Sequence, residues 1–247
     1  MSKPGFAVAD KANYGVEGIR EVKMLWGLGT ILLIATIFLF RIDGLVWTIL
    51  SIILLIITLI SYGEAVLMTL SSKKGQGRVV KDILEKLKLK KEDLVLDVGC
   101  GRGFLMNSMA KQVSGGKVIG IDNWSDKRHQ NTLETTLQNA DTEGVKDRIE
   151  VQTADARNLP FEDDTFDAVA SSLTIHTLPD QDERQKALAE IVRVLKPGGR
   201  VAVLDFMYVE EYPAILEKVG LKNVEKSQFY FSMFPPVIIV SGMKKED

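Results

Sequence analysis

The sequence has few of the residues that cross-link a chain or hold a metal ion. Its 247 residues include one cysteine, Cys100, and two histidines. A single cysteine excludes an intrachain disulfide framework, which fits a reducing compartment. No Cys, His or carboxylate residues cluster at the spacing of a metal site, so we expect no metal ligand.

Excess positive charge is also absent. The formal net charge is −2 and the pI is about 5.9. Proteins that bind nucleic acid through its backbone usually carry a basic patch or stripe. We therefore expect no nucleic-acid partner.

Two stretches lack charged residues altogether. They run from Met24 to Phe40 and from Leu45 to Gly63. A membrane-spanning helix needs ~20 apolar residues, with a usable range of about 17–25. Gly44 can make a tight turn between them, so residues 24–63 are predicted to form a transmembrane helical hairpin. Two core helices of a soluble domain are the alternative, although core helices usually keep a polar stripe. A cleaved signal peptide is disfavoured, because a second apolar run follows at once.

Basic residues flank the predicted hairpin on both sides, whereas its loop offers only Arg41 beside Asp43. The positive-inside rule then places both chain ends in the cytosol. We expect an integral membrane protein with the lipid bilayer as a partner and a cytosolic soluble domain. Gly27 and Gly29 would allow the hairpin to pair with a copy of itself in a homo-oligomer. The flanking basic residues are Lys3, Lys11, Arg20, Lys23, Lys73, Lys74, Arg78 and Lys81.

The order of segments predicts four parts: an N-terminal cytosolic segment (1–23), the hairpin (24–63), a juxtamembrane linker and helix (64–90) and an α/β domain (91–247). Residues 71–75 are predicted to be a hinge. Alternating strands and helices favour a parallel sheet with helices on both faces, and the last two strands are expected to be antiparallel. The predicted strands are 94–98, 117–121, 149–153, 166–171, 200–206, 224–231 and 236–242; the helices are 103–112, 125–143 (capped by Ser125), 181–195 (stopped by Pro197-Gly198-Gly199) and 210–219.

A glycine-rich turn follows the first of these strands. Gly99, Gly101 and Gly103 have the spacing G-x-G-x-G, and Asp97 precedes them. Glycines let the backbone turn sharply and let a ligand approach closely. Nucleotide-dependent oxidoreductases use G-x-G-x-x-G at this place. A carboxylate suits a pyrophosphate poorly and suits an ammonium group well, so Asp97 argues against that alternative.

Two further carboxylates end neighbouring strands. Asp122 can accept the hydroxyls of a ribose, and Asp155 can accept the exocyclic amine of an adenine. In open α/β sheets the carboxyl ends of the strands hold the ligand. A ligand with an amine, a ribose and an adenine, and without phosphate, is S-adenosylmethionine (SAM).

The blocks LDVGCGRG (96–103), GID (120–122), TADARNLPF (153–161) and VLKPGGRV (194–201) resemble class I SAM-dependent methyltransferases of the type 11 group in order and spacing. The resemblance implies a Rossmann-like seven-stranded methyltransferase fold, with SAM as cofactor and S-adenosylhomocysteine as product. It also implies Asp97, Gly99, Cys100, Gly101, Gly103, Asp122, Asn123, Asp155, Ala156 and Ser172 as cofactor-binding residues. Tyr14-Gly15-Val16-Glu17 and GIDNW (120–124) also resemble a group of membrane-anchored methyltransferases.

This class has no fixed catalytic signature, because methyl transfer needs alignment of the reactants more than a general base. His176, in the loop after the fourth strand, is the candidate catalytic residue, since histidine titrates near neutrality. A local packing role for His176 is the alternative. Tyr14 could cap the site from the N-terminal segment.

The anchor favours an acceptor that is small and hydrophobic or amphiphilic, such as a lipid headgroup amine, a quinone-like phenol or an apolar thiol. The predicted function is therefore that of a membrane-anchored SAM-dependent methyltransferase. A non-catalytic SAM-binding membrane protein and a nucleotide-dependent oxidoreductase are the alternatives.

Overall fold

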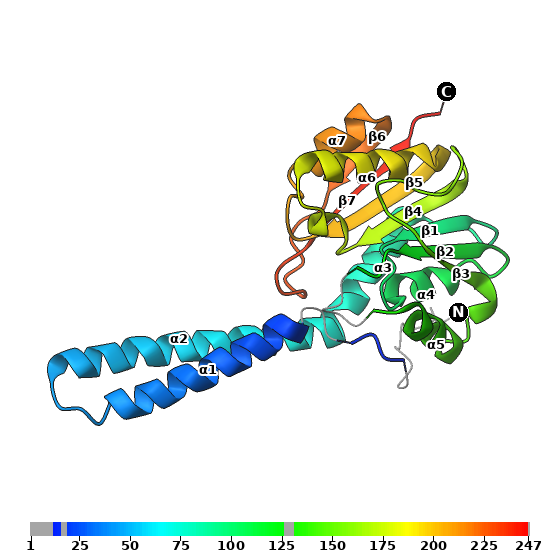
Figure 1. Cartoon of the computed structure of the whole chain (residues 1–247). Coiled ribbons are helices and arrows are strands. Elements are labelled where there is room, and N and C mark those ends of the chain that lie inside the picture. Colours follow the sequence, from blue (N-terminus) through cyan, green and yellow to red (C-terminus); the bar gives the residue numbers. More distant parts are fainter. Residues whose placement is uncertain (1–11, 16–18, 126–130, 247) are drawn as a thin grey trace.

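A computed structural model describes residues 12–15, 19–125 and 131–246. It shows an α/β domain from which a long helical hairpin projects (Figure 1). The hairpin consists of α1 (Ile19–Leu39) and α2 (Leu45–Leu70). Gly44 precedes α2 with a φ of 129°, a conformation that favours glycine.

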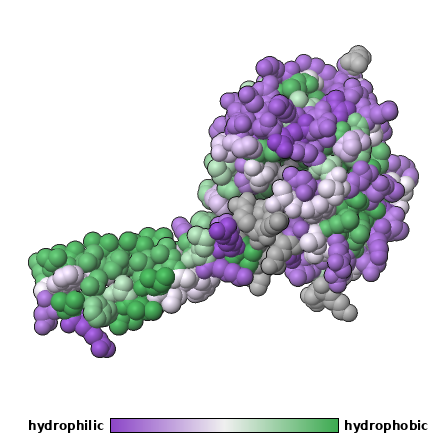
Figure 2. Space-filling model, viewed as in Figure 1, coloured by the Kyte–Doolittle hydropathy of each residue, from purple (hydrophilic) through white to green (hydrophobic). Residues whose placement is uncertain are grey.

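The hairpin surface is almost wholly apolar (Figure 2). In each helix only 17% of the most apolar window is buried, unlike a core helix, and both helices are long and apolar enough to cross a membrane. The two helices pack against each other at Gly29, where an added Cβ would lie 2.6 Å from the Tyr62 ring. Gly29 is one of the two glycines expected to allow pairing between copies, but here it packs against Tyr62 of the same hairpin.

The backbone stays helical where a hinge was predicted. Ser71–Gly75 form a turn of π-helix, η1, which leads directly into α3 (Gln76–Leu87). An added Cβ at Gly75 would lie 1.9 Å from the carbonyl oxygen of Ser232, so the glycine permits close contact with the loop before the last strand. The hinge prediction was therefore wrong, because the chain continues as helix against the domain.

The sheet has seven strands in the order β3-β2-β1-β4-β5-β7-β6. Strands β1 to β5 are parallel, and β7 runs antiparallel to both of its neighbours. This confirms the predicted Rossmann-like sheet and its antiparallel end. The strands are β1 (Leu94–Val98), β2 (Lys117–Asp122), β3 (Ile149–Thr153), β4 (Phe166–Ser172), β5 (Leu195–Asp205), β6 (Leu221–Lys226) and β7 (Ile238–Lys244).

Helices cover both faces of the sheet. On one face α3, α4 (Phe104–Ala110) and α5 (Leu133–Thr142) contribute side chains such as Ile83, Met106 and Ala140 to one apolar cluster. On the other face α6 (Gln181–Arg193) and α7 (Tyr212–Lys218) contribute to a second. Burial of apolar area at these two layers is the main favourable term for folding.

Some predicted boundaries were wrong. Helix α5 begins at Leu133, because Thr132 accepts a hydrogen bond from the Thr135 N–H and caps it; Ser125 instead bonds to Asn123 Oδ1. Residues 126–130 of the predicted helix lie outside the described residues. Helix α6 ends at Arg193, and Pro197-Gly198-Gly199 lie within β5 rather than stopping a helix. Strand β6 ends at Lys226, where the prediction continued to 231.

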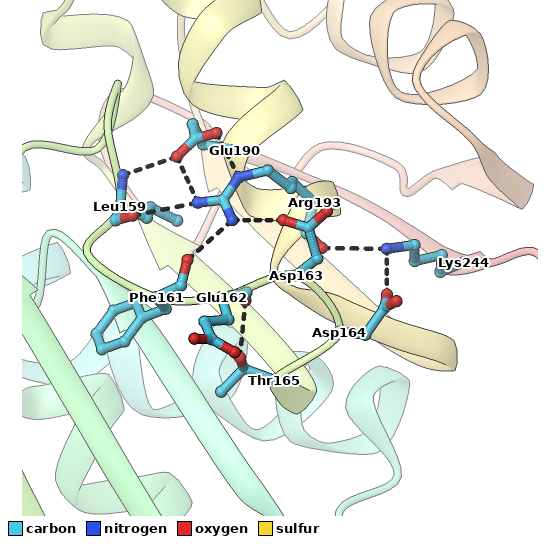
Figure 3. A network of polar contacts seen from close by, with 9 residues as sticks. All are labelled: Leu159, Phe161, Glu162, Asp163, Asp164, Thr165, Glu190, Arg193 and Lys244. Carbon is cyan, nitrogen blue, oxygen red and sulfur yellow. Dashed lines mark hydrogen bonds and ion pairs between the residues drawn. The ribbon is translucent and has the colours of Figure 1, made fainter.

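Arg193 fixes the loop that leads from β3 to β4 (Figure 3). Its guanidinium donates to both carboxylate oxygens of Glu190, at 2.7 and 2.8 Å, and to the carbonyl oxygens of Leu159 and Phe161. Glu190 in turn accepts the Leu159 N–H at 2.8 Å. None of these residues lines the cleft described below, and the network joins the loop between β3 and β4 to α6.

Candidate functional site

A cleft lies at the carboxyl ends of β1, β2 and β4. Nine of the ten predicted cofactor-binding residues line it: Asp97, Gly99, Cys100, Gly101, Asp122, Asn123, Asp155, Ala156 and Ser172. Gly103 does not line it; it takes a φ of 84° as the residue before α4. Glycine is therefore favoured at position 103 by the backbone conformation that begins α4.

The glycine turn is held against neighbouring strands. The N–H groups of Gly99 and Cys100 both donate to the Ile121 carbonyl, at 2.8 and 2.9 Å. Gly99 and Gly101 have φ values of 76° and 50°. An added Cβ at Gly99 would lie 2.1 Å from Thr174 Oγ1, so the loop after β4 closes directly over the turn.

Asp97 is the most unusual group of the cleft. Asp97 is 1% exposed, and neither carboxylate oxygen makes a hydrogen bond of regular geometry with the described residues. Burial raises the pKa of Asp97 to about 7; the nearby Met106 backbone N–H opposes this increase, and the charge of Asp122 adds to it. A buried carboxylate that lacks a protein partner is costly unless a cation or donor reaches it. Asp97 is therefore suited to a ligand that carries a positive donor.

Asp122 lies at the tip of β2 and already accepts two backbone hydrogen bonds. Gly101 N donates to Oδ2 at 3.0 Å, and Trp124 N donates to Oδ1 at 2.8 Å. An ionised carboxylate has about four acceptor positions, so each oxygen can take one more donor. The Trp124 indole donates to Thr153 Oγ1 at 2.9 Å and forms a wall of the cleft.

Asp155 is bound to Arg157. The guanidinium donates to both carboxylate oxygens, at 2.8 and 2.5 Å, and a further bond links Arg157 to Glu183. The hydrogen bonds from Arg157 lower the pKa of Asp155, so it stays ionised near neutral pH. Its backbone neighbour Ala156 lines the cleft beside it.

His176 is held from behind by Asp205. The Asp205 carboxylate, which is fully buried, accepts the His176 backbone N–H at 2.9 Å and lies 2.6 Å from the ring Nδ1. This ring contact does not have the alignment of a regular hydrogen bond. Asp205 also accepts the Tyr212 hydroxyl at 3.0 Å. His176 does not line the cleft, whereas its neighbours Thr174 and Thr177 do.

Tyr14 crosses over the edge of the cleft from the N-terminal segment. Its ring meets Phe104 edge-on at 4.9 Å, and its hydroxyl bonds to Asn107 and Glu143. The neighbouring Asn13 exchanges two backbone hydrogen bonds with the Asn139 side chain. The placement predicted for Tyr14 at the site is thus confirmed, and residues 12–15 fasten the start of the chain to α4 and α5.

Several cleft residues had no signal in the sequence. Gln76 and Val80 come from α3, and Met233 comes from the loop between β6 and β7. Thr174 and Leu178 come from the loop after β4. These side chains come from segments far apart in the chain, so only the folded structure brings them to one edge.

Residues 96–203 match the family model described as a methyltransferase domain. The chain is 33% identical to the demethylmenaquinone methyltransferase of Lactobacillus johnsonii, with 68% of this chain and 62% of the relative covered. It is 39% identical to the chloroplastic 2-phytyl-1,4-beta-naphthoquinone methyltransferase of Arabidopsis thaliana, with 53% and 49% covered. A solved SAM-dependent methyltransferase from Aquifex aeolicus shares 25% identity at a TM-score of 0.53, with 67% of this chain and 89% of that one covered. The chain belongs to the class I SAM-dependent methyltransferases.

SAM is accordingly the cofactor of this methyltransferase domain. The chain spans 62% and 49% of the two relatives' lengths, and the similarity lies mainly in the domain behind the hairpin. The similarity therefore covers only part of each relative, and it does not assign their substrates to this chain.

Proposed function

We propose that this methyltransferase acts at a membrane surface and methylates a small hydrophobic or amphiphilic acceptor. One observation carries the proposal: Gln76 and Val80 of α3 line the cleft together with Met233, and α3 continues through η1 from the apolar hairpin. A molecule dissolved in the bilayer would meet this side of the cleft first.

The residues of the cleft fit SAM. The Asp97 carboxylate matches the ammonium group, and the glycine turn lines the cleft beside it, where the amino-acid end of the molecule would lie. Asp122 has free acceptor positions for ribose hydroxyls. Asp155, with Ala156, would face the adenine, and Ser172 the methionine end.

SAM supplies a methyl group on a sulfonium, and the chain's task is to align an acceptor with it. Orientation and exclusion of water can lower such a barrier by about 7–11 kcal/mol. Where the acceptor is a phenol, a base has to take its proton. His176 is our candidate, since the buried Asp205 carboxylate accepts its backbone N–H and lies 2.6 Å from its ring Nδ1. Because the ring stands behind the cleft wall, this role requires the loop 174–178 to shift when the acceptor binds.

Apolar side chains in the lining support an apolar acceptor. Val80, Leu178, Leu204 and Met233 all line the cleft. Both relatives described above are named for naphthoquinone-type substrates. A prenylated quinone-like phenol is therefore the first acceptor to try, ahead of a lipid headgroup amine.

The test uses the full chain in detergent and in lipid vesicles. Calorimetric titration should show micromolar binding of SAM or S-adenosylhomocysteine, lost in Asp122→Ala, with NAD as the negative control. Labelled SAM then measures transfer to demethylmenaquinone that dithionite has reduced to its phenolic hydroquinone form in the vesicles, and to a short-chain, water-soluble naphthol analogue. We expect the vesicle-borne acceptor to react faster with the full chain than with residues 64–247. Equal rates for the two forms would remove the support for a membrane acceptor, and absence of SAM binding would overturn the cofactor assignment in this chain.

A further inference from the structure

The loop between β6 and β7, residues 227–237, carries two of the most exposed large apolar side chains of the described α/β domain. Phe229 is 55% exposed and Phe231 is 80% exposed. Their ring centroids lie 6.0 Å apart, so they form one aromatic patch. Single exposed apolar residues need no explanation, but two adjacent phenylalanines on an ordered loop do.

The backbone of this loop is well fastened. Tyr230 N donates to the Val237 carbonyl at 2.8 Å, and Ser227 N donates to Ile239 O at 2.9 Å. Tyr230 packs against the core cluster of the domain, whereas Phe229 and Phe231 on either side of it are exposed. The Tyr230 hydroxyl lies by Asp82 of α3, and burial together with this contact raises the pKa of Tyr230 to about 12. The outward direction of the two phenylalanines is thus set by the fold.

The same loop touches the base of the hairpin. Ser71 Oγ donates to the Phe234 carbonyl at 3.5 Å, and Gly75 lies against the Ser232 carbonyl. Figure 1 shows the loop (orange to red) at the edge of the domain that faces the hairpin, near the start of α3. The apolar helix α2, which is long enough to cross a membrane, ends at Leu70, so Ser71 is the first residue after it.

We propose that Phe229 and Phe231 form a second membrane contact, an aromatic foot that rests in the headgroup layer beside the hairpin. This inference rests on the membrane placement given above as proposed function. Aromatic side chains favour that layer. The occupant is the bilayer rather than another protein, because the loop that carries the patch contacts Ser71 and Gly75 directly after the apolar hairpin. Since Met233 of the same loop lines the cleft, the foot would hold the mouth of the cleft at the bilayer surface.

Three variants of the full chain, each with one added cysteine, test the foot: Phe231→Cys, Leu133→Cys and Leu55→Cys. Cys100 is buried, so a fluorescent maleimide should react first at the introduced thiol, and the unaltered chain gives the background. Leu133 is the matched control, because it is an exposed apolar residue, 40% exposed, at the start of α5. Leu55 lies in the middle of α2 and reports on the hairpin. Each labelled protein is placed in vesicles that contain doxyl-labelled lipids, and SAM binding confirms folding.

We expect strong lipid quenching at residue 55, intermediate quenching at residue 231 with a blue-shifted emission, and none at residue 133. Equal quenching of residues 231 and 133 by aqueous acrylamide, with residue 55 still quenched by lipid, would overturn the foot and leave the hairpin anchored. Protection of residue 231 from acrylamide without lipid quenching would assign the patch to a protein partner and also overturn it. Absence of lipid quenching at residue 55 would overturn the membrane placement itself.

Discussion

Asp97 is the residue whose charge depends most on the ligand. Without SAM its buried carboxyl has a pKa raised to about 7, above the ordinary value of 3.8. Its folded form therefore holds a proton more tightly than its unfolded form does between about pH 4 and 7. The contribution of Asp97 to stability is largest at the acidic end of this window and is lost as the pH rises through 7. A bound ammonium group reverses the preference, because it favours the ionised carboxylate.

Replacing Asp97 by Asn should separate folding from cofactor binding. The amide stays neutral, so the melting temperature of the SAM-free protein at pH 7.5 should rise. Affinity for SAM should fall about 10–100-fold, the equivalent of losing a charged hydrogen bond of ~1.5–3 kcal/mol. Thermal melting and calorimetry measure the two effects. Asp141→Asn on the exposed surface of α5 is the control and should change neither; a parallel loss of stability and affinity in Asp97→Asn would contradict the assignment.

The same carboxyl predicts how SAM affinity depends on pH. Below pH 7 the unliganded carboxyl is protonated, and SAM binding has to release that proton. Affinity should therefore fall as the pH drops below 7, approaching about tenfold for each pH unit. Titration in buffers of different ionisation enthalpy would show release of one proton near pH 6. An affinity that is flat from pH 5.5 to 7.5 would show that Asp97 does not meet the ammonium group.

The sequence could predict the carboxylates of the cleft, but not the side chains that reach it from α3 and from the loop between β6 and β7. Asp97, Asp122 and Asp155 each lie at or directly after the end of a strand, and parallel strands bring such ends to one edge. Gln76 and Met233 reach the same edge from α3 and from a loop near the end of the chain. No periodicity or spacing in the sequence indicates those distant contacts, since they depend on how α3 packs across the sheet.

At the scale of elements, the hairpin depends on close contact between its helices. Gly29→Ala would place a Cβ 2.6 Å from the Tyr62 ring and separate the helices, whereas a Cβ at Gly27 has nothing within 4 Å. Small residues at such contacts let apolar helices pack closely in a membrane. Gly29→Ala should therefore lower the melting temperature of the hairpin in detergent, followed by circular dichroism. Gly27→Ala is the matched control; equal effects of the two substitutions would show that Gly29 is not at the contact.

Arg193 stabilises the loop before β4 through hydrogen bonds. Arg193→Ala removes its bonds to Glu190 and to the Leu159 and Phe161 carbonyls. We expect a loss of about 2–3 kcal/mol in the free energy of unfolding, because partly buried acceptors are left without a donor. Urea unfolding of the variant measures it, with Lys81→Ala, in an exposed ion pair on α3, expected to cost at most ~0.5 kcal/mol. SAM affinity should change little, as this network lies away from the cleft.

Element boundaries were predicted well where the apolar pattern was strong and poorly where local hydrogen bonds decide. Strands β1 to β3 match their predicted ranges within a residue. The start of α5 was wrong because the Thr132 cap, rather than Ser125, supplies the first side-chain acceptor. Pro197-Gly198-Gly199 lie in an irregular start of β5, where the register with β4 shifts between Phe166 and Ala168.

At the scale of the whole molecule, two fastenings link the hairpin to the methyltransferase domain. The continuous helix from α2 through η1 to α3 is one, and the contacts of Asn13 and Tyr14 with α4 and α5 are the other. The segment before the hairpin and the helix after it therefore both contribute residues to the cleft, Tyr14 and Gln76. A membrane protein built in this way would hold its cleft at a fixed height above the bilayer.

The orientation of the hairpin in the membrane can be predicted from its charged flanks. Basic residues on both sides of the hairpin favour a cytosolic domain, where SAM is available, with Ile42 in the outer loop. In a bacterial host, a membrane-impermeant maleimide should label Ile42→Cys once the outer membrane is opened but the inner membrane is intact. Lys245→Cys, near the end of the chain, should react only after the inner membrane is permeabilised. The unaltered chain, whose one thiol is buried, sets the background. Labelling of residue 245 before residue 42 would place the cleft in the compartment that lacks SAM and would contradict the proposed function.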